Sequence, residues 1–270
     1  MDIASIITKR ILEAKFEDMP PRVVHATKAV ILDELAIALA GSAAEGAVQV
    51  VEEVVDWGGK AESTIWVYGN RVPVANAAFA NSVMTHGWDM DDAHMPSITH
   101  TGTVTVPAAF AIGERRGKLS GKELLTAVNI GIEILTRLSG AVPNSFAEGW
   151  HPTTLFGAFG TAATSGWILG LSEGQMLNAL GLTYSRASGN IQCMEDGSLS
   201  KRLQPGFATK AAIEAVLLAQ KGVSGATNVF EGVYGLFPLY FKSKGNHNSI
   251  TRDWGKIFAT TNITFKLYPG

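Results

Sequence analysis

An uncharged stretch of eighteen residues, 154–171, constrains the fold of this chain more than any other feature. It has the minimum length of a membrane span, but four glycines and several Thr and Ser residues make it weakly hydrophobic. No basic flank would orient such a span. Glycine lets a neighbouring backbone approach closely. We therefore predict a buried helix of a soluble protein, packed tightly against other helices.

The rest of the chain is also patterned mainly as helices. Residues 21–40 predict an amphipathic helix closed by Gly41, with one apolar face formed by Val24, Ile31, Leu32, Leu35 and Leu39. Further helices are predicted at 47–57, 75–90, 105–116, 121–139, 153–170, 173–186 and 207–221. Short strands are predicted at 63–68 and 263–268. The fold class is therefore all-α, a multi-helix domain with minor short strands.

Composition and charge limit the partners and the cellular compartment that we expect for this protein. Hydrophobic residues make up 46% of the chain and charged residues only 17%, so part of the surface is expected to be buried in a homodimer or larger complex. A net charge of −2 offers no electrostatic basis for binding nucleic acid. Cys193 is the single cysteine, which excludes an internal disulfide. Because the first residues lack a signal peptide pattern, we expect a cytoplasmic protein that does not insert into membranes.

The segment at residues 88–107 gathers five ionisable side chains between apolar, Ala-rich flanks. They are Asp89, Asp91, Asp92, His94 and His100. A partly desolvated carboxylate beside an imidazole is suited to proton transfer. Two other interpretations stay open: Asp91 and Asp92 are helix C-terminal or capping residues, or four of the side chains bind a metal. That metal set would be Asp91, Asp92, His94 and His100, whose spacing matches no known signature.

Three potential cations stand just before predicted helix starts. His100, His151 and Lys201 each lie a few residues upstream of a helix. Helix N-termini offer unpaired N–H groups and a positive dipole end, so three converging ends would bind an anion with more than one carboxylate. The alternatives are a structural role for a histidine, which is favoured for His86, His94 and His247, and an exposed basic pair formed by Lys201 and Arg202.

Several segments, taken in order along the chain, resemble the MmgE/PrpD family. They are G-W-D-M-D-D-A-H-M-P-S-I-T-H, G-W-H-P-T-T-L-F-G-A-F-G-T-A-A, G-S-L-S-K-R-L-Q-P-G-F-A-T-K-A-A and F-K-L-Y-P. Family members include 2-methylcitrate dehydratase, cis-aconitate decarboxylase and iminodisuccinate epimerase. The resemblance implies a large helical domain, a smaller α+β lid, a site between them, no metal or organic cofactor, and a dimer.

The resemblance also implies roles for particular residues. The implied catalytic residues are Asp89, His100 and His151, and the implied substrate-binding residues are Asp92, His94, Lys201 and Lys266. Ala93 departs from the family pattern, in which threonine often follows D-x-D-D, so one hydrogen bond to the substrate is expected to be missing.

Relatives of the resembled family are longer than this chain. We expect residues 1–262 to form the helical domain and residues 263–270 to begin a lid domain that is otherwise absent. The expected explanations are a truncated product or a lid carried on a separate polypeptide.

These patterns lead to one main functional hypothesis and two alternatives. The main hypothesis is a cofactor-independent hydro-lyase that removes a proton next to a carboxylate of a 2-methylcitrate-like tricarboxylate. The first alternative is a cis-aconitate-type decarboxylase or a dicarboxylate epimerase, because all three reactions need similar groups. The second is a non-catalytic scaffold or one subunit of a split enzyme.

Overall fold

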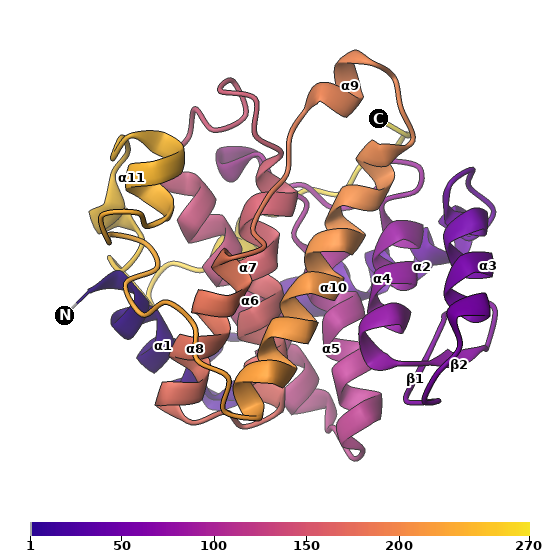
Figure 1. Ribbon diagram of the computed structural model, residues 1–270, viewed down its shortest axis with the longest axis horizontal. Helices are drawn as coiled ribbons and strands as arrows, with labels where there is room; N and C mark the ends of the chain where they lie inside the picture. The colour runs from indigo at the N-terminus through magenta and orange to yellow at the C-terminus, as the bar shows by residue number, and fades with distance from the viewer. Residues whose placement is uncertain (1) are drawn as a thin grey trace.

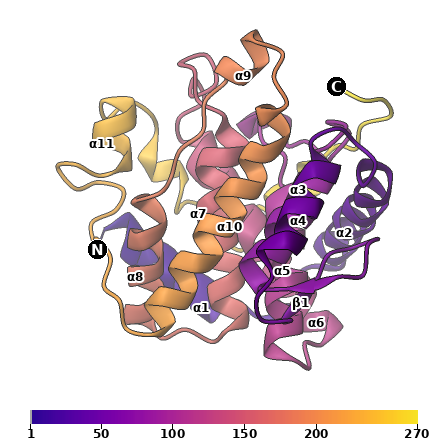
Figure 2. The same ribbon diagram turned by 45° about the vertical axis from the view of Figure 1, so that its right-hand side comes forward.

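Helix α7 (Pro152–Ile168), which contains most of the uncharged stretch, occupies the centre of the molecule (Figure 1). Every residue of α7 except Trp167 is buried. Helices α5 (Gly102–Arg116), α6 (Gly121–Gly140), α8 (Glu173–Tyr184) and α10 (Ser200–Gln220) contact it. The long α10 crosses α7 in both views (Figures 1 and 2). The predicted buried helix is therefore confirmed, and none of the helices in residues 2–270, the part that this computed structural model describes, could span a membrane.

The remaining elements surround this centre and make the fold all-α. The other helices are α1 (Ile3–Glu13), α2 (Pro21–Gly41), α3 (Ala47–Trp57), α4 (Val74–Thr85), α9 (Gln192–Glu195) and α11 (Leu236–Phe241). Four short 3₁₀ turns lie at Phe16–Asp18, Met95–Ser97, His247–Ser249 and Ala259–Asn262. The strands β1 (Ser63–Thr64) and β2 (Arg71–Val72) pair antiparallel, with Ser63 opposite Val72.

Helices α6 and α7 cross at two glycines. A Cβ added to Gly160 would lie 2.8 Å from the Gly131 carbonyl oxygen, and one added to Gly131 would lie 2.9 Å from the Gly160 carbonyl oxygen. Backbone atoms in the middle of two packed helices cannot move aside. The close packing predicted from the glycines of the uncharged stretch is therefore present at this crossing.

Two helices begin earlier than predicted. Helix α5 starts at Gly102 and α10 at Ser200, so Pro107 and Pro205 lie inside helices. Pro107 lacks the N–H that would bond to the Thr103 carbonyl oxygen. That oxygen instead accepts a hydrogen bond of 2.6 Å from the Ser82 hydroxyl. Tertiary contacts thus compensate for a helix-breaking residue.

Three other predicted elements are wrong in extent. The helix predicted at 75–90 ends at Thr85, and the strand predicted at 63–68 keeps only two residues in β1. The strand predicted at 263–268 is reduced to a single bridge between Ala93 and Thr264. Within the described residues, β1 pairs with β2 and packs on α4 and α5, and Thr264 pairs with Ala93, so neither segment has the partners that a longer strand needs.

The predicted inner face of α2 is also wrong. Leu32 and Leu39 are 70% and 64% exposed, whereas Glu34 is fully buried. The inward residues are Val23, Thr27, Val30, Glu34, Ile37, Ala38 and Gly41. Because α2 carries apolar residues on both faces, periodicity alone did not identify the one that meets α4 and α5.

The glycine crossing gives a direct stability test. We expect Gly160→Ala to lower the free energy of unfolding by about 1–3 kcal/mol, because the methyl group would overlap the Gly131 carbonyl oxygen. The matched control is Gly174→Ala in α8, where an added Cβ meets no atom within 4 Å. Urea unfolding measures both. Equal stability of the two variants would contradict the close crossing.

Candidate active site

The Asp89 carboxylate lies at the meeting point of segments that are distant in sequence. Its Oδ2 is 2.7 Å from Nζ of Lys201 in the first turn of α10, and its Oδ1 is 2.8 Å from Nζ of Lys266 near the C-terminus. His100 Nε2 lies 3.7 Å from the same Oδ1. Asp89 itself sits in a turn after α4 with a left-handed φ of 51°. The structure therefore places two ammonium groups and one imidazole around one carboxylate.

Three histidines extend this cluster into the helical core. His86 Nδ1 is 2.7 Å from Asp91 Oδ2, and both side chains are fully buried. The His86 ring centroid lies 5.1 Å from that of His100 and 6.0 Å from that of His151. Sequence reasoning favoured a structural role for His86 and did not include it in the site. The sequence feature that could have indicated His86 as a site residue is its position three residues before Asp89.

Backbone contacts define the tautomer of His100. His100 Nδ1 lies 2.8 Å from the Asp92 carbonyl oxygen, which can only accept a hydrogen bond. Nδ1 must therefore carry the proton, and Nε2 faces Asp89 and the ammonium groups. The backbone N–H of His100 also donates to Thr153 Oγ1 at 2.9 Å, which connects the backbone at His100 to the start of α7.

Asp92 has a different position from its neighbours. Its carboxylate is fully buried and accepts from the Thr101 N–H, the Thr101 hydroxyl and the Gly102 N–H at 3.0, 2.6 and 2.6 Å. An acid at a helix N-terminus satisfies unpaired N–H groups and the helix dipole. Asp92 therefore caps α5, and its side chain points to the helix and not to the cluster.

The electrostatics separate the roles of the acids and the histidines. Burial works to raise the pKa of the Asp89 carboxyl, but the His86 ring and the two ammonium groups outweigh it and hold that pKa below its ordinary value. Burial is likewise outweighed at Asp91, where the His100 and His86 rings lower the pKa to about 2. At His151, burial is the largest cause and the neighbouring His86, His100 and Lys201 add to it, which together lower the pKa to about 3. The site thus holds ionised aspartates and a neutral His151 near pH 7.

The structure brings together most of the predicted site residues. Asp89 contacts His100, Lys201 and Lys266, and His151 adjoins this group through His86. Lys201 lies inside α10 and not before it, while His151 immediately precedes Pro152 as the N-cap of α7. His94 is outside the cluster: its Nδ1 bonds Ser97 Oγ at 2.7 Å, and it borders a separate hollow with Arg137.

The metal set considered from the sequence is not assembled. Asp92 caps a helix and His94 points elsewhere. Another group of four has potential ligand atoms within 4.8 Å of one another: His86, Asp89, Asp91 and His100. Both oxygens of Asp89 already bind ammonium groups, which would repel a metal cation. This charge arrangement fits an anionic ligand better than a metal.

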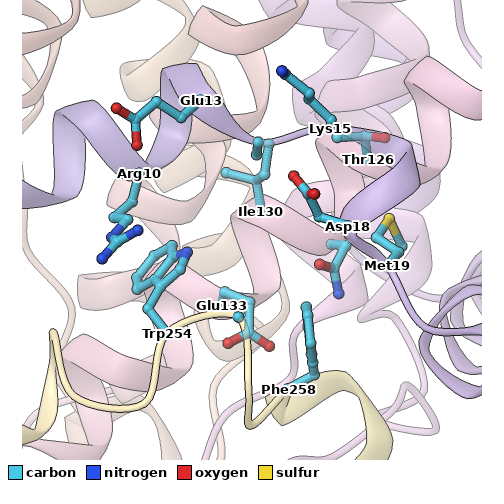
Figure 3. A pocket seen from close by; sticks show the side chains of 13 residues that line it. Arg10, Glu13, Lys15, Asp18, Met19, Thr126, Ile130, Glu133, Trp254 and Phe258 are labelled. Atoms are coloured by element: carbon cyan, nitrogen blue, oxygen red, sulfur yellow. The ribbon is translucent and has the colours of Figure 1, made fainter.

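Two hollows of about 360 Å³ lie on the protein. One begins at Thr154, whose hydroxyl bonds His151 Nδ1, and extends along polar groups that include Asn190 and Gln204. The other lies between α1, α6 and the segment around Trp254 (Figure 3). Side chains of both signs line this second hollow, and its buried Glu133 is already bonded to Arg137 and to the Ala259 N–H. None of the predicted site residues lines either hollow, but the first adjoins the cluster through the bond between Thr154 and His151.

Comparison with known proteins assigns this helical, carboxylate-lined domain to a family. The model of the MmgE/PrpD N-terminal domain matches residues 5–248, so the chain belongs to the MmgE/PrpD family. It is 30% identical to a cis-aconitate decarboxylase-like protein, oryM, of Aspergillus oryzae, over 96% of this chain and 56% of that protein. It is 29% identical to cis-aconitate decarboxylase of Aspergillus terreus and 30% identical to that of Homo sapiens, over 93% and 94% of this chain and 54% of each relative. The chain thus spans about half the length of the curated relatives it matches.

Neutral His151 gives a pH-dependence test. Its pKa is about 3 in the folded protein and about 6.5 in an unfolded chain, so the unfolded chain binds more protons between these values. The contribution of neutral His151 to the free energy of unfolding is therefore fully present above about pH 6.5 and is lost as the pH falls toward 3. Between these pH values the free energy of unfolding rises with pH, and we expect His151→Gln to reduce that slope by up to about 1.4 kcal/mol per pH unit.

Urea unfolding between pH 4 and 7.5 measures that slope. The control is His25→Gln, because His25 is exposed in the folded protein and its substitution should leave the slope unchanged. An unchanged slope in His151→Gln would show that the imidazole is not held neutral by burial.

Proposed function

We propose that this chain carries the acid–base half of a lyase that acts on a tricarboxylate. One observation carries the proposal: the Lys201 and Lys266 ammonium groups and the His100 ring surround one carboxylate, that of Asp89. The same groups suit the carboxylates of a substrate. The family membership and the names of the relatives support this assignment.

The chemistry requires cations at this place. Removing a proton next to a carboxylate, or expelling CO2 from an adjacent carbon, builds negative charge on the substrate. Preorganised cations and N–H groups stabilise such charge in the transition state. Lys201 and Lys266 supply fixed positive charge, and His151 stands at the N-terminus of α7.

His100 is the best-placed acid or base. Its Nδ1–H is held by the Asp92 carbonyl oxygen, so Nε2 is the atom that gains or loses a proton on the side of the ammonium groups. Asp89 is a weaker base because two ammonium groups hold its charge. We assign Asp89 the role of positioning the two lysines, and His151 that of a neutral hydrogen-bonding partner.

The relatives favour one reaction within this class. Proteins named cis-aconitate decarboxylase match most of this chain, so we propose decarboxylation of a cis-aconitate-like acid. The C–C bond to the departing carboxylate breaks and releases CO2, and the double bond shifts by one carbon. The far alkene carbon accepts a proton from Nε2 of His100 in its protonated form, and the ring regains that proton from water. Dehydration of 2-methylcitrate would use the same ring to remove a proton and to protonate the leaving hydroxyl. Epimerisation of a dicarboxylate would use it for proton removal and return.

This chain matches only about half of each relative, so the proposed active site needs a second part. Because the matched region is about half of each relative, we propose that an α+β lid following residue 262, on the same or a separate polypeptide, completes the site. Excluding water strengthens the electrostatic interactions in a closed site. The alternative is a scaffold or subunit that is not catalytic by itself.

Turnover assays test the lyase proposal. The chain, alone and mixed with a family lid domain, is incubated with cis-aconitate or 2-methylcitrate, and products are identified by NMR. We expect CO2 release from cis-aconitate and a loss of at least about 10²-fold in His100→Gln, because proton transfer then fails.

His25→Gln, an exposed histidine variant, should keep wild-type turnover. Alkene formation from 2-methylcitrate would favour the dehydratase. No turnover with either acid, with or without the lid, would favour the non-catalytic scaffold.

We also propose that the chain forms a homodimer. Leu32, Leu35 and Leu39 are exposed along one side of α2, and such an apolar stripe is suited to an interface. A stable dimer needs a buried area of at least about 1,000 Å².

Sedimentation velocity at micromolar concentration tests the dimer. We expect the wild type to sediment as a dimer and the double variant Leu32→Lys, Leu39→Lys to sediment as a monomer, because the added charges would be buried. Val233→Lys, at a residue that is 82% exposed elsewhere, should remain dimeric. A monomeric wild type would overturn the proposal.

A further inference from the structure

A strap formed by residues 250–262 is fastened to helix α6 by one arginine. The Arg137 guanidinium lies 4.6 Å from the centroid of the Trp254 ring, and it also donates hydrogen bonds to three backbone carbonyl oxygens of the strap. They belong to Ile250, Arg252 and Ile257, at 3.3, 2.8 and 3.0 Å. The guanidinium is planar and rigid, so three carbonyl groups bound to it are fixed relative to one another.

Two further side chains on the same face of α6 complete the fastening. Glu133 accepts from Arg137 Nε at 3.0 Å through Oε2, and from the Ala259 N–H at 2.6 Å through Oε1. Asn129 Nδ2 donates to Thr260 Oγ1 at 2.6 Å. Residues four positions apart share one helix face. The side chains of Glu133 and Arg137 are only 6% and 11% exposed, so water does not compete strongly for the contacts of this ion pair.

The strap leads directly to the candidate active site. Thr264 and Ala93 exchange backbone hydrogen bonds of 2.9 and 2.8 Å. Two residues further on, Lys266 Nζ donates to the carbonyl oxygen and to Oδ1 of Asp89 at 2.7 and 2.8 Å. Only four residues separate Ala259 from Thr264. So short a connection leaves little slack, and the fastening on α6 therefore limits where Lys266 can lie.

The two lysines of the site reach Asp89 by different routes. Lys201 belongs to the first turn of the long helix α10, which the core holds in place. Lys266 has no helix beneath it and follows the Ala93–Thr264 bridge by two residues. A lysine side chain loses much rotamer freedom when its ammonium is held at one point. A backbone fixed in advance reduces the entropy that remains to be lost.

We propose that Glu133 and Arg137 are positioning residues that keep the Lys266 ammonium in the site by fastening the strap to α6. They act through the backbone of the strap, whereas Lys201 does not depend on it. The consequence for substrate binding rests on the proposed function of Lys266, but the fastening of the lysine does not.

Acetylation of individual lysines tests the fastening without any turnover. The chain is treated with a trace of an amine-acetylating reagent, and peptide mass spectrometry gives the rate at each lysine relative to Lys60, whose side chain is 81% exposed. We expect Arg137→Gln to raise the rate at Lys266 by about tenfold or more, because a released strap opens locally and frees the amine. The rate at Lys201 should stay unchanged.

Arg252→Gln is the matched control. Its side chain is 73% exposed, and the substitution keeps the backbone carbonyl group that Arg137 binds, so the rate at Lys266 should not change. An unchanged rate at Lys266 in a folded Arg137→Gln protein would overturn the proposal. An equal rise at Lys201 would also overturn it, because it would indicate a general loosening of the site.

Glu133→Gln keeps the proposal testable if Arg137→Gln does not fold. Glutamine has nearly the same shape and still accepts from the Ala259 N–H, but it lacks the charge that holds Arg137. The acetylation rate at Lys266 should rise in this variant as well. A rate equal to that of the wild type would contradict the fastening role of the ion pair.

If the lyase assay succeeds, a double-variant comparison tests the role in substrate binding. Arg137→Gln should lower kcat/KM by about tenfold or more in the wild type but have little effect in Lys266→Gln, since the positioned ammonium is then already absent. Arg252→Gln should leave kcat/KM unchanged. Equal losses in both backgrounds would overturn that role. A failed lyase assay would leave the acetylation results intact, so failures of the function and of the fastening are distinguishable.

Discussion

Three aspartates within four residues need three separate sources of compensation, and the structure around residues 89–92 is arranged to supply them. Asp89 binds two ammonium groups, Asp91 bonds the His86 ring, and Asp92 bonds the N-terminus of α5. A buried carboxylate without such partners would lose its charge or destabilise the fold. The segment can therefore adopt its position only when α5, α10 and the C-terminal residues are all in place.

The helical core makes this arrangement possible. The uncharged α7 packs closely against α6 at two glycines and also contacts α5 and α10. His151 at the start of α7 thereby comes near His100, which precedes α5. The core thus serves the site by bringing helix starts to one place, where their N–H groups and nearby side chains favour anions.

Much of the site was predictable because its residues lie in local patterns with clear chemistry. Asp89, His100 and Lys201 come from motifs that resemble the family, and the structure places them in contact. His86 was missed because a buried histidine on an apolar helix usually has a structural role. The burial of Glu34 on the inner face of α2 was not predicted, since charged residues are usually placed on the exposed face of a helix.

The sequence by itself determined the helical class, the buried central helix and the family, because these depend on composition, periodicity and contiguous motifs. Only the tertiary structure decided which face of α2 turns inward, where α5 and α10 begin, and which partner each aspartate receives. These features depend on contacts between residues far apart in the chain, such as Lys266 with Asp89 and Gly102 with Glu34. Burial and charge compensation are satisfied by the whole fold together, and no local pattern encodes them.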